Sequence, residues 1–575
     1  MRLPAPPFVL LDDARNGGAP SRLYANPVEI VEARDMQQIE PALARLRQAS
    51  GEGLHAAGYL NYEGSSLWFG LFGDFATLNA DEVDALLPDP AGAWAGAPEP
   101  RIGWPDYRAA CNRVLDYIRA GDIYQANLTF RAALPYAGGE AALFALLRKR
   151  ARAGYGALIA TGDRWLLSFS PELFFALEAG QLTARPMKGT AARTGEGVMD
   201  AEAARALAAD AKQQAENLMI VDLMRNDLAT IAKPGTVAVP HLFQVERYPT
   251  VYQMISTVTA HLKPELDAVS ALRALFPCGS VTGAPKIRAM QIIGEVEQEP
   301  RDTYTGAIGR LDPNGDAMFN VAIRTLACDG AGRAVLGLGS GVVADSQPRA
   351  EWEECLAKGA FVTAGETRFD LIETMRFDPL DGILHLERHL SRIKESAAGF
   401  GFPFDRHAVR NELQAATFRL RHAARVRLLL GPSGAIAIGA SPLPAAPAGP
   451  VEVAIRPLPV APDDFRLRHK TSRRGFYDRA RDATGAWEVV FTDPEGYLTE
   501  GSFTSVFVAR NGVLVTPPLA RGLLPGILRA ELLETGRAVE GDLTPADLAD
   551  GFFVGNAVRG LVAAVTVAES ANADV

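Results

Sequence analysis

Lys188 and Glu172 are residues whose types and positions suit chemistry. Lys188 lies in the stretch Gln181–Thr190, in which Arg185 and Pro186 leave an apolar strand and Gly189 and Thr190 turn the chain. We therefore expect its amine to be held between a strand end and a glycine turn. If that strand pairs with the apolar run Trp165–Phe169, Glu172 faces the same pocket. A desolvated lysine becomes a nucleophile, with the carboxyl group as its acid. The alternative is a surface lysine at a hairpin.

Three glutamates form a second candidate group. Glu351 and Glu354 are three residues apart in a predicted helix, Glu351–Phe361, so their carboxylates share one face. Glu216 comes from another predicted helix, Ala215–Leu228. Carboxylates without a Cys/His cluster are typical of Mg²⁺ sites, whereas Glu351 alone is better explained as part of a solvated acidic face.

The composition limits the class of protein. The chain has 575 residues, of which 48% are hydrophobic and 22% charged, as in a soluble globular protein of several domains. Its net charge of −10 argues against a nucleic-acid partner. We find no signal peptide, no apolar run of membrane-spanning length and no disulfide framework among the four cysteines. We therefore expect a cytoplasmic enzyme that does not act at a membrane.

The order of predicted elements indicates an α+β fold with large antiparallel sheets and surrounding helices. A helix is expected from Trp104, and strands are expected at Ile123–Phe130 and Phe319–Ala327. Two stretches rich in proline and alanine interrupt this pattern. Leu87–Pro100 is interpreted as a loop or linker, and Ser441–Pro462 as a hinge between two lobes.

Eight ordered motifs across roughly residues 100–360 resemble the chorismate-utilising enzymes, which include anthranilate, isochorismate, salicylate and aminodeoxychorismate synthases. The motifs are SPELF, RPMKGT, AENLMIVDLMRND, GSVTGAPK, YTGAIG, FNVAIRTL, GSGVVADS and EWEE. The resemblance implies chorismate as substrate and Mg²⁺ held by Glu216 and Glu354, with Glu351 beside them. It also implies that the substrate is bound by Arg324, Tyr304, Gly189, Thr190, Thr282, Gly283 and Gly341.

Within that family, Lys188 resembles the aminodeoxychorismate-forming members, because anthranilate synthases carry a small alanine in its place. The resemblance implies that Lys188 attacks the chorismate ring at C2 while Glu172 protonates the departing C4 hydroxyl. Ammonia, free or from a separate glutaminase subunit, would then give 4-amino-4-deoxychorismate. Two positions depart from the family pattern: Gln253 replaces a frequent histidine, and Gln213 replaces a carboxylate.

A second set of motifs resembles the class IV pyridoxal-phosphate enzymes, over roughly residues 368–570. The motifs are HLERHLSRI, HKTSRRGFYDRA, GYLTEGSFTSVFV and TPPLARGLLPGILRAELLE. The resemblance implies that Lys470 forms the Schiff base with pyridoxal phosphate and that Glu500 pairs with the pyridinium nitrogen. Arg392 and the backbone at Ile527 and Leu528 would hold the phosphate.

Together these patterns predict a chorismate-utilising domain over residues 1–365 and a two-lobed class IV domain over residues 366–575. The expected function is bifunctional: the second domain, which could form a homodimer, would eliminate pyruvate to give 4-aminobenzoate, a folate precursor. One alternative is an isochorismate, salicylate or anthranilate synthase-like domain fused to a class IV aminotransferase. Another is a non-catalytic C-terminal module, against which Lys470, Glu500 and Arg392 together argue. Ser505 replaces an asparagine that many class IV members carry.

Overall fold

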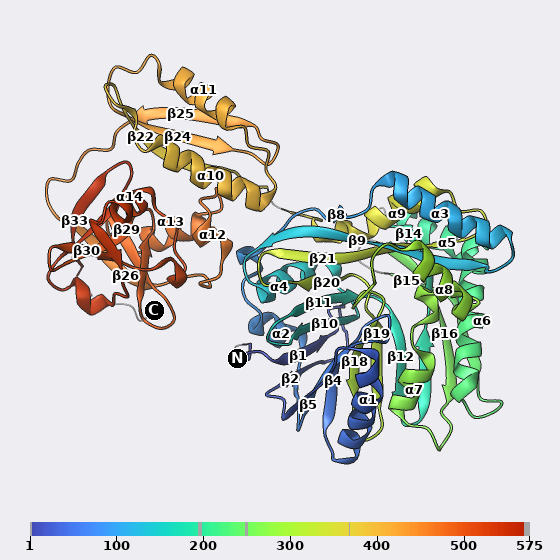
Figure 1. The fold of residues 1–575 in the computed structure, drawn as a ribbon. Helices are drawn as coiled ribbons and strands as arrows, with labels where there is room; N and C mark the ends of the chain where they lie inside the picture. The colour runs from blue at the N-terminus through green and yellow to red at the C-terminus, as the bar shows by residue number, and fades with distance from the viewer. Residues whose placement is uncertain (1–2, 194–197, 248–250, 367, 568–575) are drawn as a thin grey trace. The chain divides into compact units, whose positions relative to one another are not determined.

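The computed structural model describes residues 3–193, 198–247, 251–366 and 368–567, which form two compact units (Figure 1). The first unit is the chain up to Pro88 together with Ala97–Pro135 and Leu143–Ala364. The second is Asp89–Gly96, Tyr136–Ala142 and the chain from Gly365 onward. Both units combine sheets with helices, so the predicted α+β class is confirmed. No helix in the described ranges is long and apolar enough to cross a membrane.

Two large antiparallel sheets form the first unit. The first sheet has the order β17 (Gly283–Ala284), β9 (Gln125–Ala137), β21 (Arg333–Val342), β20 (Thr325–Cys328), β11 (Trp165–Ser170), β10 (Tyr155–Ala160), β1 (Phe8–Asp12), β2 (Ser21–Ala25) and β6 (Ala76–Leu78), with β8 (Glu99–Pro100) also on β9. The second has the order β14 (Met187–Ala192), β16 (Val251–His261), β13 (Gln181–Arg185), β12 (Leu173–Glu178), β19 (Ala317–Val321), β18 (Ala307–Leu311), β4 (His55–Leu60), β5 (Leu67–Phe72) and β3 (Glu29–Ala33), with β15 (Ala238–Arg247) on β16. Central strands such as β5 and β12 are almost continuously apolar because both of their faces are buried.

Helices cover these sheets. They are α1 (Met36–Gly51), α2 (Ala80–Leu86), α3 (Trp104–Arg119), α4 (Glu140–Ala151), α5 (Val198–Ala209), α6 (Ala211–Ile231), α7 (Ala268–Leu275), α8 (Lys286–Val296) and α9 (Pro348–Gly359). The helix expected from Trp104 is confirmed as α3. The single strand expected over Phe319–Ala327 is wrong: β19 lies in the second sheet and β20 in the first. Arg324, at φ +50°, lies where the chain changes sheets, a backbone conformation that interrupts a strand.

The second unit contains one small and one larger sheet. The small sheet has the order β23 (Gly382–Ile383), β22 (Leu371–Asp378), β24 (Ala424–Leu430) and β25 (Ile436–Pro442). The larger has the order β28 (Leu498–Gly501), β27 (Glu488–Thr492), β26 (Val451–Pro457), β33 (Gly560–Thr566), β32 (Phe552–Asn556), β29 (Ser505–Arg510), β30 (Val513–Thr516) and β31 (Ala538–Glu540). Its helices are α10 (Leu386–Phe400), α11 (Arg406–Thr417), α12 (Phe465–Arg468), α13 (Gly475–Asp482) and α14 (Ile527–Glu534).

Both stretches expected to be linkers contain ordered structure. Of the predicted hinge Ser441–Pro462, only residues 443–450 connect the two sheets, because β26 follows at Val451. Within the predicted linker Leu87–Pro100, Trp94 lies in β7 (Trp94–Ala95) and is 5% exposed. Its ring packs edge-on against Phe400 with centroids 4.9 Å apart. This short segment therefore contributes to the hydrophobic core of the second unit.

Candidate active sites

Lys188 lies in a β-bulge of β14. The strand pairs Met187 with Ile255 and then Thr190 with Gln253, so one extra residue is accommodated near Gly189, which has φ +97°. The expectation that the chain turns at Gly189 and Thr190 is wrong, because β14 continues to Ala192. The Thr190 side chain lies outside the described residues.

Two side chains from helix α6 approach the bulge. The Asn217 amide, fully buried, donates to the carbonyl oxygen of Lys188 at 3.3 Å and so anchors the distorted backbone. The Glu216 carboxylate lies 3.7 Å from the Lys188 amine. Burial raises the pKa of Glu216, and the charges of Lys188 and Lys212 oppose that effect. Asn217 thus holds the backbone of the bulge, and the Lys188 amine lies beside the Glu216 carboxylate.

Glu172 is positioned by a different strand pairing from the one expected. The apolar run before Glu172 is β11, which belongs to the first sheet, so the predicted pairing with the strand before Lys188 is wrong. Instead β12, which starts directly after Glu172, pairs with β13 in the second sheet. The Glu172 side chain is buried, and its Oε1 has no hydrogen-bond partner among the described residues. Burial raises the pKa of Glu172 to about 7, although the nearby charge of Lys188 lowers it.

Gln125 is a site residue that the sequence reasoning missed. It is fully buried on β9, and neither its amide nitrogen nor its amide oxygen has a partner in the described structure. A Cβ added at Gly341 would lie 2.5 Å from the Lys188 amine and 3.1 Å from the Gln125 amide nitrogen. The glycine therefore leaves room for both groups. A glutamine within the apolar run at Ile123–Phe130 was the available signal.

The other predicted substrate residues have different surroundings. The Thr282 hydroxyl donates to the Gly279 carbonyl at 3.0 Å, and a Cβ at Gly283 would lie 2.2 Å from the Gln125 carbonyl oxygen. Buried Tyr304 packs under Gly337, which shares one face of β21 with Gly341. Gly337 and Gly341 are four residues apart. The Tyr304 ring and the Lys188 amine therefore lie over points of β21 that are about 13 Å apart along the strand. Arg324 is half-buried at the change of sheet, and its substrate role stays a prediction.

The predicted metal ligands are separate carboxylates with polar partners. Glu354 pairs with Lys358 at 2.7 Å, and Glu351 accepts a hydrogen bond from the Ser346 hydroxyl at 2.7 Å. Within the described ranges, no three or more His, Cys, Asp or Glu side chains are arranged to hold a metal ion. Mg²⁺ is commonly bound through one or two carboxylates, with substrate oxygens and water completing the shell. Glu216 and Glu354 supply carboxylates of the type that Mg²⁺ takes, and their assignment as ligands stays a prediction.

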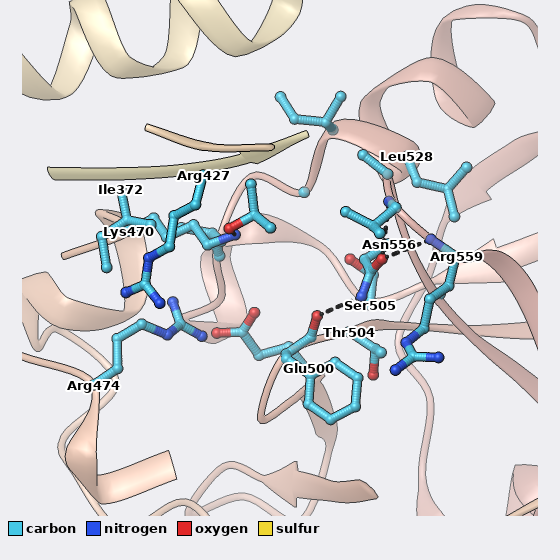
Figure 2. A pocket seen from close by; sticks show the side chains of 18 of the residues that line it. Ile372, Arg427, Lys470, Arg474, Glu500, Thr504, Ser505, Leu528, Asn556 and Arg559 are labelled. Atoms are coloured by element: carbon cyan, nitrogen blue, oxygen red, sulfur yellow. Dashed lines mark hydrogen bonds between the residues drawn. The ribbon is translucent and has the colours of Figure 1, made fainter. Parts of the chain in front are cut away.

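A cavity of about 440 Å³ in the second unit brings together the predicted cofactor residues (Figure 2). The Lys470 amine donates to the Thr374 hydroxyl at 3.3 Å. Burial, followed by the charge of Arg392, lowers the pKa of Lys470 to about 7. Glu500, at the end of β28, is buried and accepts a hydrogen bond from Tyr477. Burial raises its pKa to about 7.

Arg392 is held by Glu373 at the edge of the same cavity. Its Nε and Nη2 donate to the two Glu373 oxygens at 2.8 and 2.6 Å, and Nη1 donates to the Pro525 carbonyl at 2.9 Å. A guanidinium has five N–H groups, so two remain for a ligand. Ile527 and Leu528 begin α14 and also line the cavity. An amine, a buried carboxyl, a fixed cation and a helix N-terminus fit pyridoxal phosphate, while each assigned contact stays a prediction.

Comparison with known proteins separates the same two regions. Residues 74–364 match the family described as chorismate binding enzyme, and residues 370–567 match amino-transferase class IV. Aminodeoxychorismate synthase component 1 from Klebsiella aerogenes is 44% identical over 253 residues, which cover 44% of this chain and 56% of that protein. Anthranilate synthase component 1 from Bacillus pumilus is 40% identical over 253 residues, covering 44% of this chain and 49% of that protein.

A solved structure supports the fold of the first unit. Anthranilate synthase component I from Streptococcus pneumoniae TIGR4 is 26% identical, with a TM-score of 0.53, and covers 60% of this chain and 93% of that chain. The chain spans about half the length of the curated relatives it matches. Because the first family match extends over more than half of the 575 residues, this chain belongs to the chorismate binding enzymes and carries, in addition, a class IV amino-transferase domain.

Proposed function

We propose that the first unit converts chorismate and ammonia into 4-amino-4-deoxychorismate, and that the second converts this product into 4-aminobenzoate and pyruvate. The observation that carries the first step is Lys188, held in a bulge beside Glu216, Glu172 and Gln125. Overall identity does not separate the alternatives, because the relatives include an anthranilate synthase at 40%. The lysine supports the aminodeoxychorismate assignment.

In the proposed first reaction, Lys188 forms a bond to ring carbon C2 and the C4 hydroxyl leaves with a proton from Glu172. Ammonia then forms a bond at C4, and the lysine departs. A carboxyl group with a pKa of about 7 is protonated in about half of the molecules at neutral pH, as a general acid requires. The buried amide of Gln125 offers a donor and an acceptor beside the lysine, which suits the orientation of ammonia.

Mg²⁺ held by Glu216 and Glu354 would supply positive charge for a carboxylate of chorismate. We further propose that ammonia comes from a separate glutaminase subunit, because the relative from Klebsiella aerogenes is named as component 1 of its synthase. The Mg²⁺ assignment requires that both glutamates be ionised, close to each other and accessible to substrate; Glu354 is exposed and Glu216 half-buried.

For the second reaction, bound pyridoxal phosphate would supply an electron sink for the electrons of the breaking C–H bond. Lys470, whose pKa of about 7 leaves much of the amine unprotonated, would move the ring proton. Glu500 would pair with the cofactor's pyridinium nitrogen, and Arg392 would hold the phosphate. Thr374 keeps the amine directed into the cavity through their hydrogen bond. We propose the elimination over amino-group transfer because it consumes the product of the first unit.

The test is a product assay with chorismate, Mg²⁺ and ammonium, in which the products are separated by chromatography. We expect 4-aminobenzoate and pyruvate from the wild-type protein. The Lys188→Ala variant should form neither, whereas Lys233→Ala, which changes an exposed lysine, should retain full activity. Anthranilate, isochorismate or salicylate as the main product, or full activity of Lys188→Ala, would show the proposal to be wrong.

A further inference from the structure

Arg474 lines the cofactor cavity but has no role in the function proposed above. It directly precedes α13, and its Nη2 donates to the Ser502 carbonyl at 2.9 Å. The guanidinium carbon lies 4.7 Å from the centre of the Tyr477 ring. Nη1 is buried without a partner in the described structure. The side chain is therefore fixed at two points, while its charge is not neutralised by any ion pair found there.

Both contacts of Arg474 lead to Glu500. Tyr477 is almost fully buried and donates a hydrogen bond to Glu500, while Ser502 lies two residues after Glu500 at the end of β28. Figure 2 shows the Arg474 side chain extending toward the Glu500 carboxylate, with Lys470 in the same cavity. The Arg474 guanidinium thus contacts the Tyr477 ring, whose hydroxyl group hydrogen-bonds to Glu500. It also binds the carbonyl oxygen of Ser502 directly after β28.

The charge of Arg474 acts in the same direction on two site residues. Burial is the main cause of the lowered pKa of the Lys470 amine, and four nearby charges also act on it: Arg392, Glu373, Arg474 and Arg427. The positive charge of Arg474 lowers this pKa further. Burial raises the pKa of Glu500, on which Tyr477, Arg474 and Glu488 also act. The positive charge of Arg474 lowers this pKa and so opposes the effect of burial. A cation disfavours a second cation nearby and favours an anion.

We propose that Arg474 is a positioning residue of the second site: it fixes Glu500 through Tyr477 and Ser502, and its positive charge favours the carboxylate form of Glu500 and the neutral amine of Lys470. This inference rests on the proposed use of pyridoxal phosphate. A neutral amine is the form that attacks the cofactor's aldehyde, and a carboxylate is the form that pairs with its pyridinium nitrogen. Arg474 would therefore prepare both ends of the site for the cofactor before it binds.

The test compares Arg474→Gln, which removes the charge, with Arg474→Lys, which keeps it. Arg479→Gln, on the exposed side of the same helix, is the matched control. Full-length proteins are loaded with pyridoxal phosphate, and the absorbance of the bound cofactor is titrated with pH. Loss of a nearby positive charge should raise the midpoint of the colour change by about one pH unit in Arg474→Gln. The Lys variant and the Arg479 control should stay close to wild type.

Affinity for pyridoxal phosphate, measured by fluorescence titration of the apoprotein, gives a second readout. We expect it to fall about tenfold in Arg474→Gln, since less of Lys470 is neutral and less of Glu500 ionised. A Gln variant that binds the cofactor with an unchanged midpoint would overturn the inference, as would equal shifts in the Gln and Lys variants, which indicate only a packing role. A wild-type protein that binds no pyridoxal phosphate would instead refute the proposed function together with the inference.

Discussion

Replacing Glu172 with glutamine is expected to stabilise the first unit while abolishing its reaction. Burial raises the pKa of Glu172 from its ordinary value of 4.5 to about 7, which corresponds to about 3 kcal/mol. Below about pH 4.5 the carboxyl group is neutral in both folded and unfolded chains, so the wild type pays no penalty. As pH rises from about 4.5 to 7, the unfolded chain loses this proton first, and the relative stability of the folded state falls. Glutamine avoids that loss.

The predicted gain in the free energy of unfolding therefore grows from near zero at pH 4.5 to about 3 kcal/mol at pH 8. Urea unfolding followed by hydrogen exchange of peptides from β12 would report this unit separately. The rate of 4-amino-4-deoxychorismate formation, measured at a constant concentration of unprotonated ammonia, should fall at least about 100-fold in the variant. In the wild type, this rate should decline about tenfold per pH unit above pH 7, as the protonated acid is lost.

Glu178→Gln, at the exposed end of β12, the strand that follows Glu172, is the matched control and should change neither quantity. A Glu172→Gln protein that is less stable than wild type at pH 8 would refute the claim that burial disfavours the charge. Undiminished synthesis by the variant would refute the assignment of Glu172 as the acid. The two measurements thus test the electrostatic argument and the chemical argument independently.

Three further predictions address other parts of the molecule. Glu216→Gln and Glu354→Gln should each lower 4-amino-4-deoxychorismate synthesis more than about 100-fold. EDTA should inhibit the first reaction but not the second when each is assayed with its own substrate. Equal inhibition of both reactions would contradict two separate sites. Gly341→Ala should lower the first reaction about tenfold or more, because its Cβ would lie 2.5 Å from the Lys188 amine, and should leave the second unchanged, as separate assays would show. Lys470→Ala should be colourless after incubation with pyridoxal phosphate and should accumulate 4-amino-4-deoxychorismate from chorismate; normal 4-aminobenzoate output would reject the assignment.

The candidate site residues were chosen from the sequence, but their arrangement in the fold could not be predicted from it. The charge of Lys188 acts on buried Glu172, although the expected turn is a bulge and the expected strand pairing does not exist. A bulge depends on how two strands align, and Gly189 allows it without requiring it. Arg324 shows the same limit: its backbone conformation lets the chain pass from one sheet to the other within a single apolar run.

Residues that act through burial were harder to find. Gln125 is one polar residue in an apolar strand, and only the fold shows that both of its amide atoms lack partners. Arg474 belongs to a run of basic residues that usually indicates a solvated surface. The prolines around β26 indicated a hinge instead of a strand. Within Val451–Ile455, however, Val451 and Val453 are two residues apart and both are buried, as in a strand with one face on the core. In each case the local pattern was present, and its meaning depended on residues distant in sequence.

The placement of Asp89–Gly96 has a consequence for how such a chain can evolve. This segment lies inside the region that matches the chorismate binding family, yet its Trp94 side chain completes a core with Phe400 and Phe465 in the second unit. A gene recombined or truncated near codon 365 would separate that tryptophan from its aromatic neighbours. Exchanging the second unit for a homologue is therefore expected to preserve its core only if Asp89–Gly96 is exchanged with it, and exchanging the first only if this segment is kept.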